Sequence, residues 1–267
     1  MTAITVRYVG GPTALLEIGP WRLLTDPTFD PPGGRYFFGW GTASRKLQAP
    51  AIAFEMLEPV HAVLLSHDHH GDNLDPAGRA LLPRMGTIIT TAPGSRRLGA
   101  GRSGADVRGL VPGQSTLLSA EGRPPLRITA TPCRHGPPGS GPIVGAVIGF
   151  DLGWEGQEHG TLWITGDTVL YDGLRTAVRG MHVSVAVVHL GGVTFPWLSG
   201  RLRYTMNAAE ATDLCRELAP ETILPLHFEG WRHFRQSREE AVAQLAASPF
   251  AGRVRWPAAG ESVTLEV

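Results

Sequence analysis

Hydrophobic residues in this chain fall into short runs, and stretches rich in glycine and proline separate one run from the next. Short runs of valine, isoleucine, leucine and threonine bounded by such residues are typical of β-strands. The early runs follow one another without helical segments between them. We expect strands at 3–9, 13–19, 21–25, 60–65, 87–91, 106–110, 115–118, 125–131, 143–151, 160–165, 183–188, 222–226, 252–256 and 262–266.

Helical periodicity is clearest at 207–218, where Ala208, Ala211 and Leu214 lie three residues apart on one face. Asn207 precedes this face and suits the N-cap position. Further helices are expected at 74–82, 93–99, 171–179 and 238–247. Because later strands alternate with helices, the pattern favours an α/β (α+β) fold in which helices cover the outer faces of two sheets, rather than a barrel of repeated units.

Composition narrows the class of protein. The chain has 24 basic and 24 acidic residues, so no net field favours binding to nucleic acid or to an anionic membrane. No apolar span is long enough to cross a membrane, and the N-terminus has no secretion signal. We therefore expect a cytoplasmic protein without stable membrane insertion that acts on a small molecule. Its oligomeric state stays open.

The densest group of possible metal ligands directly follows the predicted strand at 60–65. Imidazoles spaced this closely, with carboxylates beside them, suit a borderline-soft divalent cation such as Zn²⁺. A solvated polar loop is the alternative interpretation. The group consists of His67, Asp68, His69, His70 and Asp72.

Three more possible ligands occupy the same kind of position. His135, Asp167 and His227 each follow a stretch with strand character. Loops at strand ends can direct side chains into a site while the buried strand fixes their root. The four strand ends therefore predict one site for one or two metal ions. Because the ligands span 67–227 and no linker divides the chain, we expect a single domain over 1–267.

In these residues the sequence resembles the metallo-β-lactamase fold superfamily, whose metal-dependent hydrolases have a four-layer αββα sandwich of two mixed sheets flanked by helices. The segments at 9–18 and 23–27 are similar to the branch that contains ascorbate-6-phosphate lactonase and N-acyl-phosphatidylethanolamine phospholipase D. The resemblance implies two metal ions, zinc first and manganese or iron as alternatives. It implies the ligands His67, His69, Asp72, His135, Asp167 and His227.

The chain departs from the family pattern after His69. Where the family has Asp-His-Leu-Asp, this chain reads Asp72-Asn73-Leu74-Asp75, so an amide replaces an imidazole at the second metal. Amides bind transition metals less well than imidazoles do. His70 could supply the missing nitrogen, or it could instead point to solvent or form a supporting hydrogen bond, as could Asn73. We expect the remaining histidines, His61, His159, His182 and His189, to be structural.

The expected chemistry is hydrolysis of an ester-type bond, either a phosphodiester or a lactone or carboxylic ester, by a metal-activated water. Asp72 and Asp167 are the expected catalytic carboxylates. Trp231 and His233 follow the last ligand and could contact substrate, and the segment 29–41 could form a mobile flap over it. A catalytically idle metal-binding protein and an iron-containing redox enzyme are the alternatives.

Overall fold

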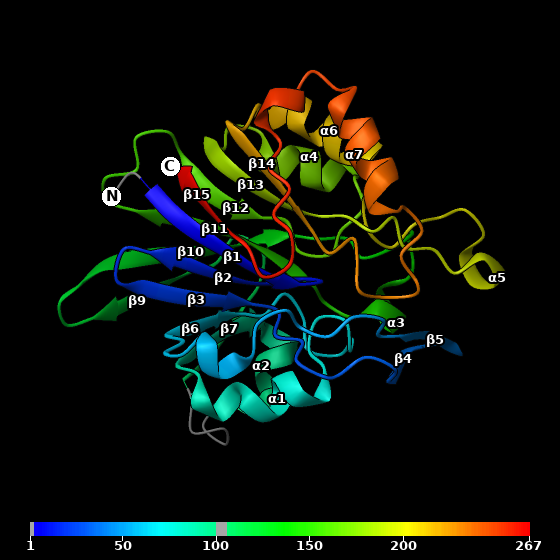
Figure 1. The fold of residues 1–267 in the computed structure, drawn as a ribbon, viewed down its shortest axis with the longest axis horizontal. Coiled ribbons are helices and arrows are strands. Elements are labelled where there is room, and N and C mark those ends of the chain that lie inside the picture. Colours follow the sequence, from blue (N-terminus) through cyan, green and yellow to red (C-terminus); the bar gives the residue numbers. More distant parts are fainter. Residues whose placement is uncertain (1–2, 100–105) are drawn as a thin grey trace.

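Two β-sheets face each other in the computed structural model, which describes residues 3–99 and 106–267, and helices cover both outer faces (Figure 1). The seven-stranded sheet has the order β15-β1-β2-β3-β6-β7-β8. Its strands are β1 (Ala3–Gly10), β2 (Thr13–Ile18), β3 (Trp21–Thr25), β6 (Ala62–Leu64), β7 (Thr87–Thr91), β8 (Val107–Leu110) and β15 (Ser262–Glu266). Strands β3, β6, β7 and β8 are parallel, whereas β15, β1, β2 and β3 pair antiparallel.

The six-stranded sheet has the order β14-β13-β12-β11-β10-β9. Its strands are β9 (Ser115–Ala120), β10 (Arg123–Pro132), β11 (Ile148–Trp154), β12 (Thr161–Ile164), β13 (Val183–His189) and β14 (Thr222–Leu226). Strands β12, β13 and β14 run parallel and the others pair antiparallel. Both sheets are thus mixed, which confirms the fold class expected from the sequence.

Helices α1 (Pro76–Leu81) and α2 (Ala92–Leu98) cover the seven-stranded sheet, while α4 (Asp172–Val178), α6 (Ala208–Leu218) and α7 (Arg238–Ala246) cover the six-stranded sheet (Figure 1). The predicted cap of α6 is confirmed, since the Asn207 side chain accepts a hydrogen bond from the Glu210 amide. None of the helices within 3–99 and 106–267 is long and apolar enough to cross a membrane.

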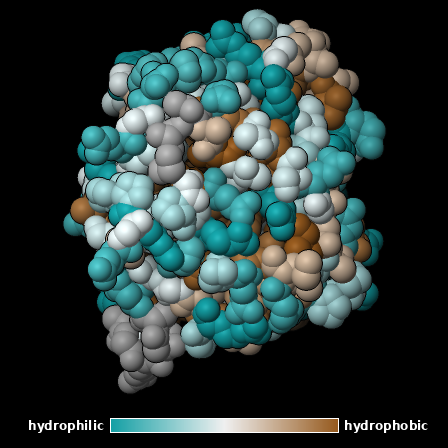
Figure 2. Space-filling model, turned by 60° about the vertical axis from the view of Figure 1, so that its left-hand side comes forward, coloured by the Kyte–Doolittle hydropathy of each residue, from teal (hydrophilic) through white to brown (hydrophobic). Residues whose placement is uncertain are grey.

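Apolar side chains fill three layers of core. The middle layer joins the inner faces of the two sheets, with Leu16 and Leu64 from one and Phe150 and Leu224 from the other. A second layer packs the six-stranded sheet against α4, α6 and α7, and a third packs the seven-stranded sheet against its own helices. On the face that Figure 2 turns forward, hydrophilic side chains predominate and hydrophobic ones occupy smaller separate areas.

Three segments differ from the sequence-based expectation. Residues 143–147 do not continue a strand, because α3 (Gly141–Val144) has Pro142 in its first turn and is followed by Gly145, whose φ is 63°. The expected strand at 252–256 begins with a 3-10 turn (Ala251–Arg253), and only Val254 forms an isolated bridge, to Ile223. The remaining 3-10 turns are Phe54–Met56 and Leu82–Arg84.

The third difference lies in the expected flap, where β4 (Arg35–Gly39) and β5 (Thr42–Arg45) form a hairpin. Trp40 and Gly41 form its tight turn with φ of 47° and 71°, and positive φ at both central residues is what a type I′ hairpin turn requires. The hairpin lies beside α3 and the short helix α5 (Pro196–Ser199), at the end of the sandwich opposite the chain termini (Figure 1).

Candidate metal centre

Side chains from both sheets meet at one end of the sandwich, where several strands terminate. His67 follows β6 and His135 follows β10, while Asp167 follows β12. His189 is the last residue of β13, and His227 comes directly after β14. All five are buried, with exposed fractions from 0% to 8%. Four predicted residues and one unexpected residue, all at strand ends, therefore lie in the same site.

Three imidazoles form the first donor group. His67, His70 and His135 present ring nitrogens that lie within 4.8 Å of one another and could hold a metal ion. Nδ1 of His70 is 3.0 Å from Nε2 of His67 and 3.2 Å from Nε2 of His135. Nδ1 of His135 donates to the Tyr204 carbonyl over 2.8 Å, which leaves Nε2 facing the group. Such a hydrogen bond fixes both the tautomer and the orientation of the ring.

His69 does not join this group, although the sequence pattern places it among the ligands. Its Nε2 instead contacts the carbonyl oxygen of Val144. The ring fills space beside Gly145, where a Cβ atom would come within 2.7 Å of His69 Cε1. His70 therefore takes the place that the family pattern assigned to His69. Asp68 also points away, with its Oδ2 2.9 Å from Nε of Arg97.

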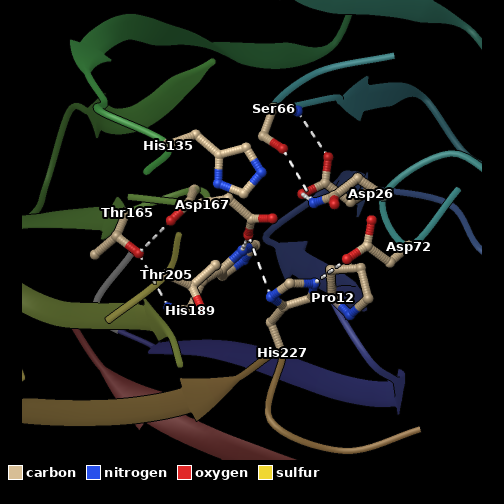
Figure 3. Close-up of polar contacts among 12 residues, drawn as sticks. Pro12, Asp26, Ser66, Asp72, His135, Thr165, Asp167, His189, Thr205 and His227 are labelled. Atoms are coloured by element: carbon tan, nitrogen blue, oxygen red, sulfur yellow. Dashed lines mark hydrogen bonds and ion pairs between the residues drawn. The ribbon is translucent and has the colours of Figure 1, made fainter. Parts of the chain in front are cut away.

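The second donor group combines a carboxylate with two imidazoles. Asp167, His189 and His227 offer atoms within 4.8 Å of one another. Oδ1 of Asp167 is 2.9 Å from Nδ1 of His189 and 3.3 Å from Nδ1 of His227. Figure 3 shows His227 between Asp167 and Asp72, whose Oδ2 lies 3.5 Å from His227 Nε2.

The backbone of His227 is held in an uncommon conformation. Its φ of 57° lies in the left-handed region, and its amide donates to the Gly11 carbonyl over 2.9 Å. Non-glycine residues adopt this region rarely, and such strain is concentrated at functional sites. The sharp turn directs the imidazole across the end of β14 toward the carboxylates.

Asn73 supports a neighbouring carboxylate and lies in neither donor group. Its Nδ2 is 3.3 Å from Oδ2 of Asp26 and 3.3 Å from Oγ of Ser66. Asp26 also accepts the Ser66 amide over 2.7 Å. Burial and the nearby charge of Asp167 raise the pKa of Asp26 to about 8. The amide at position 73 thus occupies a hydrogen-bond network beside the two groups.

The protonation of the site suits a cation. Burial and neighbouring imidazoles hold the pKa of both His67 and His70 well below the usual range, so these rings are neutral. Burial alone would raise the pKa of Asp72 and Asp167, but the interaction with His227 outweighs it and keeps both carboxyls ionised. Neutral imidazole and ionised carboxylate are the forms that bind metals.

Several polar atoms in the site lack a hydrogen-bond partner among the described residues. They include Nε2 of His70, Oδ1 of Asp72, Oδ2 of Asp167 and Nε2 of His189. A buried polar atom without a partner costs about 1–3 kcal/mol. Four such atoms in one place indicate that these residues fit a bound cation, which would satisfy donors and charges that the protein leaves unpaired.

A narrow pocket opens beside the first group, lined in part by His70 and His135. His233 lies in its wall, and its Nε2 donates to Oδ2 of Asp72 over 2.9 Å while its Nδ1 is 2.7 Å from Oγ of Ser44. Trp231 does not line this pocket. It is 3% exposed and packs against Tyr36, with ring centroids 4.8 Å apart. Trp231 therefore supports the hairpin, whereas His233 faces the space available to a substrate.

His189 was expected to be structural, but it lies in the second donor group beside Asp167 and His227. The sequence contains the relevant signal, because Val183–His189 is a strand that ends in histidine just as the neighbouring strands lead into Asp167 and His227. No second residue of a ligand type lies close to His189 in the sequence, so the clustering that marks the residues at 67–72 is missing there. In space, its neighbours come from β12 and β14, which flank β13 in the sheet.

Replacing His189 by alanine is expected to weaken metal retention by at least about 10- to 100-fold, because the variant loses one donor of the second group and even the loss of a supporting residue has an effect of that size. The carboxylate of Asp167 loses its 2.9 Å contact in this variant. Competition titration against a chromophoric chelator measures the affinity. His159→Ala is the matched control, since that side chain is 45% exposed and pairs with Glu221. Wild-type affinity in His189→Ala would show that the residue is structural after all.

Comparison with known proteins agrees with this architecture. The family described as beta-lactamase superfamily domain matches residues 21–228. A UPF0173 metal-dependent hydrolase of Pelotomaculum thermopropionicum is 26% identical over 265 residues, which cover 97% of this chain and 99% of that protein. A protein of the same name from Pyrobaculum neutrophilum is 24% identical and covers 91% of this chain and 92% of its own length.

Solved structures share the fold at lower identity. A possible metal-dependent hydrolase from Veillonella parvula has a TM-score of 0.83 at 20% identity, covering 99% of this chain and 100% of that one. The isothiocyanate hydrolase from Delia radicum gut bacteria has a TM-score of 0.81 at 20% identity, with 98% and 100% covered. CmlA, a diiron β-hydroxylase from Streptomyces venezuelae, has a TM-score of 0.66 at 15% identity, with 99% and 54% covered.

These matches confirm the superfamily resemblance seen in the sequence. The family match extends from β3 to just beyond β14 and includes every strand end that contributes to the two donor groups. Because that match covers most of the chain and the two-sheet sandwich agrees with it, the chain belongs to the beta-lactamase superfamily and has the metallo-β-lactamase fold.

Proposed function

We propose that this protein is a metal-dependent hydrolase that cleaves an ester-type bond in a small molecule. The observation that carries the proposal is the pair of buried donor groups, His67–His70–His135 and Asp167–His189–His227, the first of which borders a pocket through His70 and His135. Relatives that align over nearly their whole length are named as metal-dependent hydrolases, which supports it. All the donors come from one sandwich, which supports a single domain over 1–267.

The donor set suits one or two divalent cations, with zinc the first expectation. The three imidazoles of the first group would hold one ion. Asp72, Asp167 and His227 would hold a second, with His189 supplying the nitrogen that Asn73 cannot. When bound, such a cation lowers the pKa of a water molecule toward neutrality and polarises the oxygen of the bond to be cleaved.

The protein's own residues would position the reaction. His233 donates to Asp72, and the hydroxyl of Ser44 can donate to the other ring nitrogen of His233, so this chain of contacts fixes the Asp72 carboxylate. Asp72 then has its free Oδ1 available to accept a proton from the attacking water. Phe38 packs against both His70 and His233, with ring centroids 5.4 Å and 5.0 Å apart, and limits access of bulk water.

Two other functions compete with hydrolysis. A metal-binding protein without catalytic activity would load metal but turn over no ester. An iron-containing redox enzyme is the second alternative, because a diiron β-hydroxylase has the same fold. Iron as the native metal, with visible absorbance of the purified protein, would favour that alternative.

Elemental analysis of the purified protein, together with hydrolysis assays with and without added metal, tests the proposal. We expect between one and two divalent ions per chain and ester hydrolysis that disappears on chelation and returns with metal. Because a cation held by the folded state stabilises it, chelation should also lower the melting temperature. Metal-loaded protein that hydrolyses neither carboxylic esters, lactones nor phosphodiesters would refute the proposed function.

A further inference from the structure

We infer that the pocket beside the donor groups selects an uncharged substrate with a compact apolar group, such as a neutral carboxylic ester or lactone, rather than a phosphodiester. Leu198 and Phe195 would set the size of that group. This inference rests on the proposed function and narrows it to a substrate class.

Four of the six polar residues that line the pocket lie at its inner end, beside the donor groups. His70, His135 and Asp72 belong to the donor groups or contact them, and His233 binds Asp72. The bond to be cleaved must therefore lie at this end. The remainder of the substrate would extend along the walls, where recognition has to occur through other side chains.

Those walls are mainly apolar, although Thr42 and Tyr204 also line the pocket. Most of the apolar residues come from three segments of the chain. The hairpin supplies Phe38, α3 supplies Ile143 and Val144, and the segment ending in α5 supplies Phe195 and Leu198. The three segments lie together at one end of the sandwich (Figure 1). An enclosed apolar surface favours burial of an apolar substituent.

The segments are packed against each other, which fixes the size of the enclosed space. The Phe195 ring lies 6.3 Å from Phe38 and 5.6 Å from Tyr204, measured between centroids. A Cβ atom on Gly39 would lie 3.1 Å from Ile143, and one on Gly41 would lie 3.6 Å from Trp197. The hairpin thus touches both α3 and α5, so the pocket suits a compact group.

No lysine or arginine is among the residues that line this pocket. The basic groups of the neighbouring groove are turned away from the pocket by the alternation of an extended segment. Val193 and Phe195 face the pocket, whereas Gly192, Thr194 and Pro196 line a separate groove. That groove contains Arg201, Arg203 and Arg235.

The consequence is that a negative charge on the substrate finds no countercharge in the walls. Burying a charged group without a partner is strongly unfavourable. Cations at the donor groups would offset charge only at the scissile bond, so an anionic group further along the substrate would remain unpaired. A neutral apolar group encounters no such cost.

The test uses a matched pair of esters that differ only in charge at the far end. 4-Nitrophenyl valerate carries a terminal methyl group, and the 4-nitrophenyl monoester of glutaric acid carries a carboxylate at the same distance. With metal-loaded protein we expect kcat/KM to favour the valerate about tenfold or more, and to favour it over bis(4-nitrophenyl) phosphate. Faster hydrolysis of the phosphodiester or of the charged ester would overturn the inference and leave the hydrolase proposal standing.

Variants test the size of the pocket. Leu198→Ala should shift preference from acetate and butyrate esters toward octanoate about tenfold, and Phe195→Leu should act in the same direction. Leu117→Ala is the matched control, because that leucine is 52% exposed on β9 and lies outside the pocket. An unchanged chain-length profile in both folded variants would overturn the assignment of Leu198 and Phe195.

Binding separates this inference from the proposed function. Calorimetry with the N-phenyl amides of valeric and glutaric acid, which resist hydrolysis, should show preferential binding of the neutral amide to metal-loaded protein. If no ester is hydrolysed but this preference is present, the proposed function fails and the selectivity of the pocket stands. Equal binding of the two amides would overturn the inference without reference to activity.

Discussion

Asp167→Asn is expected to lose bound metal and to reduce kcat/KM by more than about 100-fold, a larger effect than removal of a merely supporting residue. The carboxylate is fully buried and its Oδ1 contacts both His189 and His227. The amide keeps the size of the side chain but removes its charge, so the variant isolates electrostatics from packing. Metal per chain and initial rates on the ester series measure the two effects.

The Asp167 result requires a control for the loss of one negative charge. Asp213→Asn removes a carboxylate from an exposed position on α6, where it pairs with Arg216, and should leave metal content and activity unchanged. Circular dichroism should show that both variants are folded. An Asp167→Asn protein with full metal content and wild-type turnover would contradict the assignment of Asp167 to the centre.

The largest effect on stability is expected from Asp75→Ala, at about 3–5 kcal/mol in the free energy of unfolding. Asp75 is fully buried, caps α1 by accepting the Gly78 amide, and accepts the amides of Phe29 and Asp30. Its Oδ2 also lies 2.8 Å from Nζ of Lys46, which is 4% exposed. The substitution leaves that ammonium group buried without its partner.

Denaturant unfolding of the Asp75 variant, compared with wild-type protein, gives the loss directly. The double variant Lys46→Met with Asp75→Ala should recover part of it, because no unpaired charge then remains buried. Asp213→Ala, which removes an exposed ion pair, should change stability by less than about 0.5 kcal/mol. A loss of similar size in Asp75→Ala and Asp213→Ala would show that the buried Lys46–Asp75 pair stabilises the fold no more than an exposed pair does.

Asp75 also connects the stability of the fold to the pocket. The same carboxylate holds the start of the segment at 29–34 and, through Lys46, the end of the hairpin that supplies Phe38. Lys46 lies over the Trp231 ring, 5.7 Å from its centroid. The segment at 29–41, which the sequence suggests as a mobile flap, is therefore attached at its start through Asp75.

Strand ends made most of the site predictable from the sequence. His67, His135, Asp167 and His227 all follow buried runs of hydrophobic residues, and a sheet fixes where such positions lie. His189 obeys the same rule and could have been identified by applying it to every strand. Hydrophobic periodicity and helix capping are set by local sequence, and they therefore predicted most strands and α6.

The choice between His69 and His70 could not be made from the sequence. Adjacent residues in an irregular loop point in different directions according to backbone angles that have no repeating pattern. Here the decision depends on α3, because Val144 and Gly145 receive the His69 ring. The sequence did not predict the hairpin, because its turn places Trp40 in a left-handed conformation. Glycine or asparagine at such a position is the usual sequence signal for this type of turn.

The donors also come from opposite halves of the sandwich. His67 and His70 follow a strand of the seven-stranded sheet, whereas His135, Asp167, His189 and His227 belong to strands of the six-stranded sheet or directly follow them. A cation bound among them would cross-link the two sheets across their shared core. Metal binding and docking of the two sheets are then parts of one equilibrium. Removal of the metal should therefore speed the hydrogen exchange of buried amides more along this interface than in the outer helices.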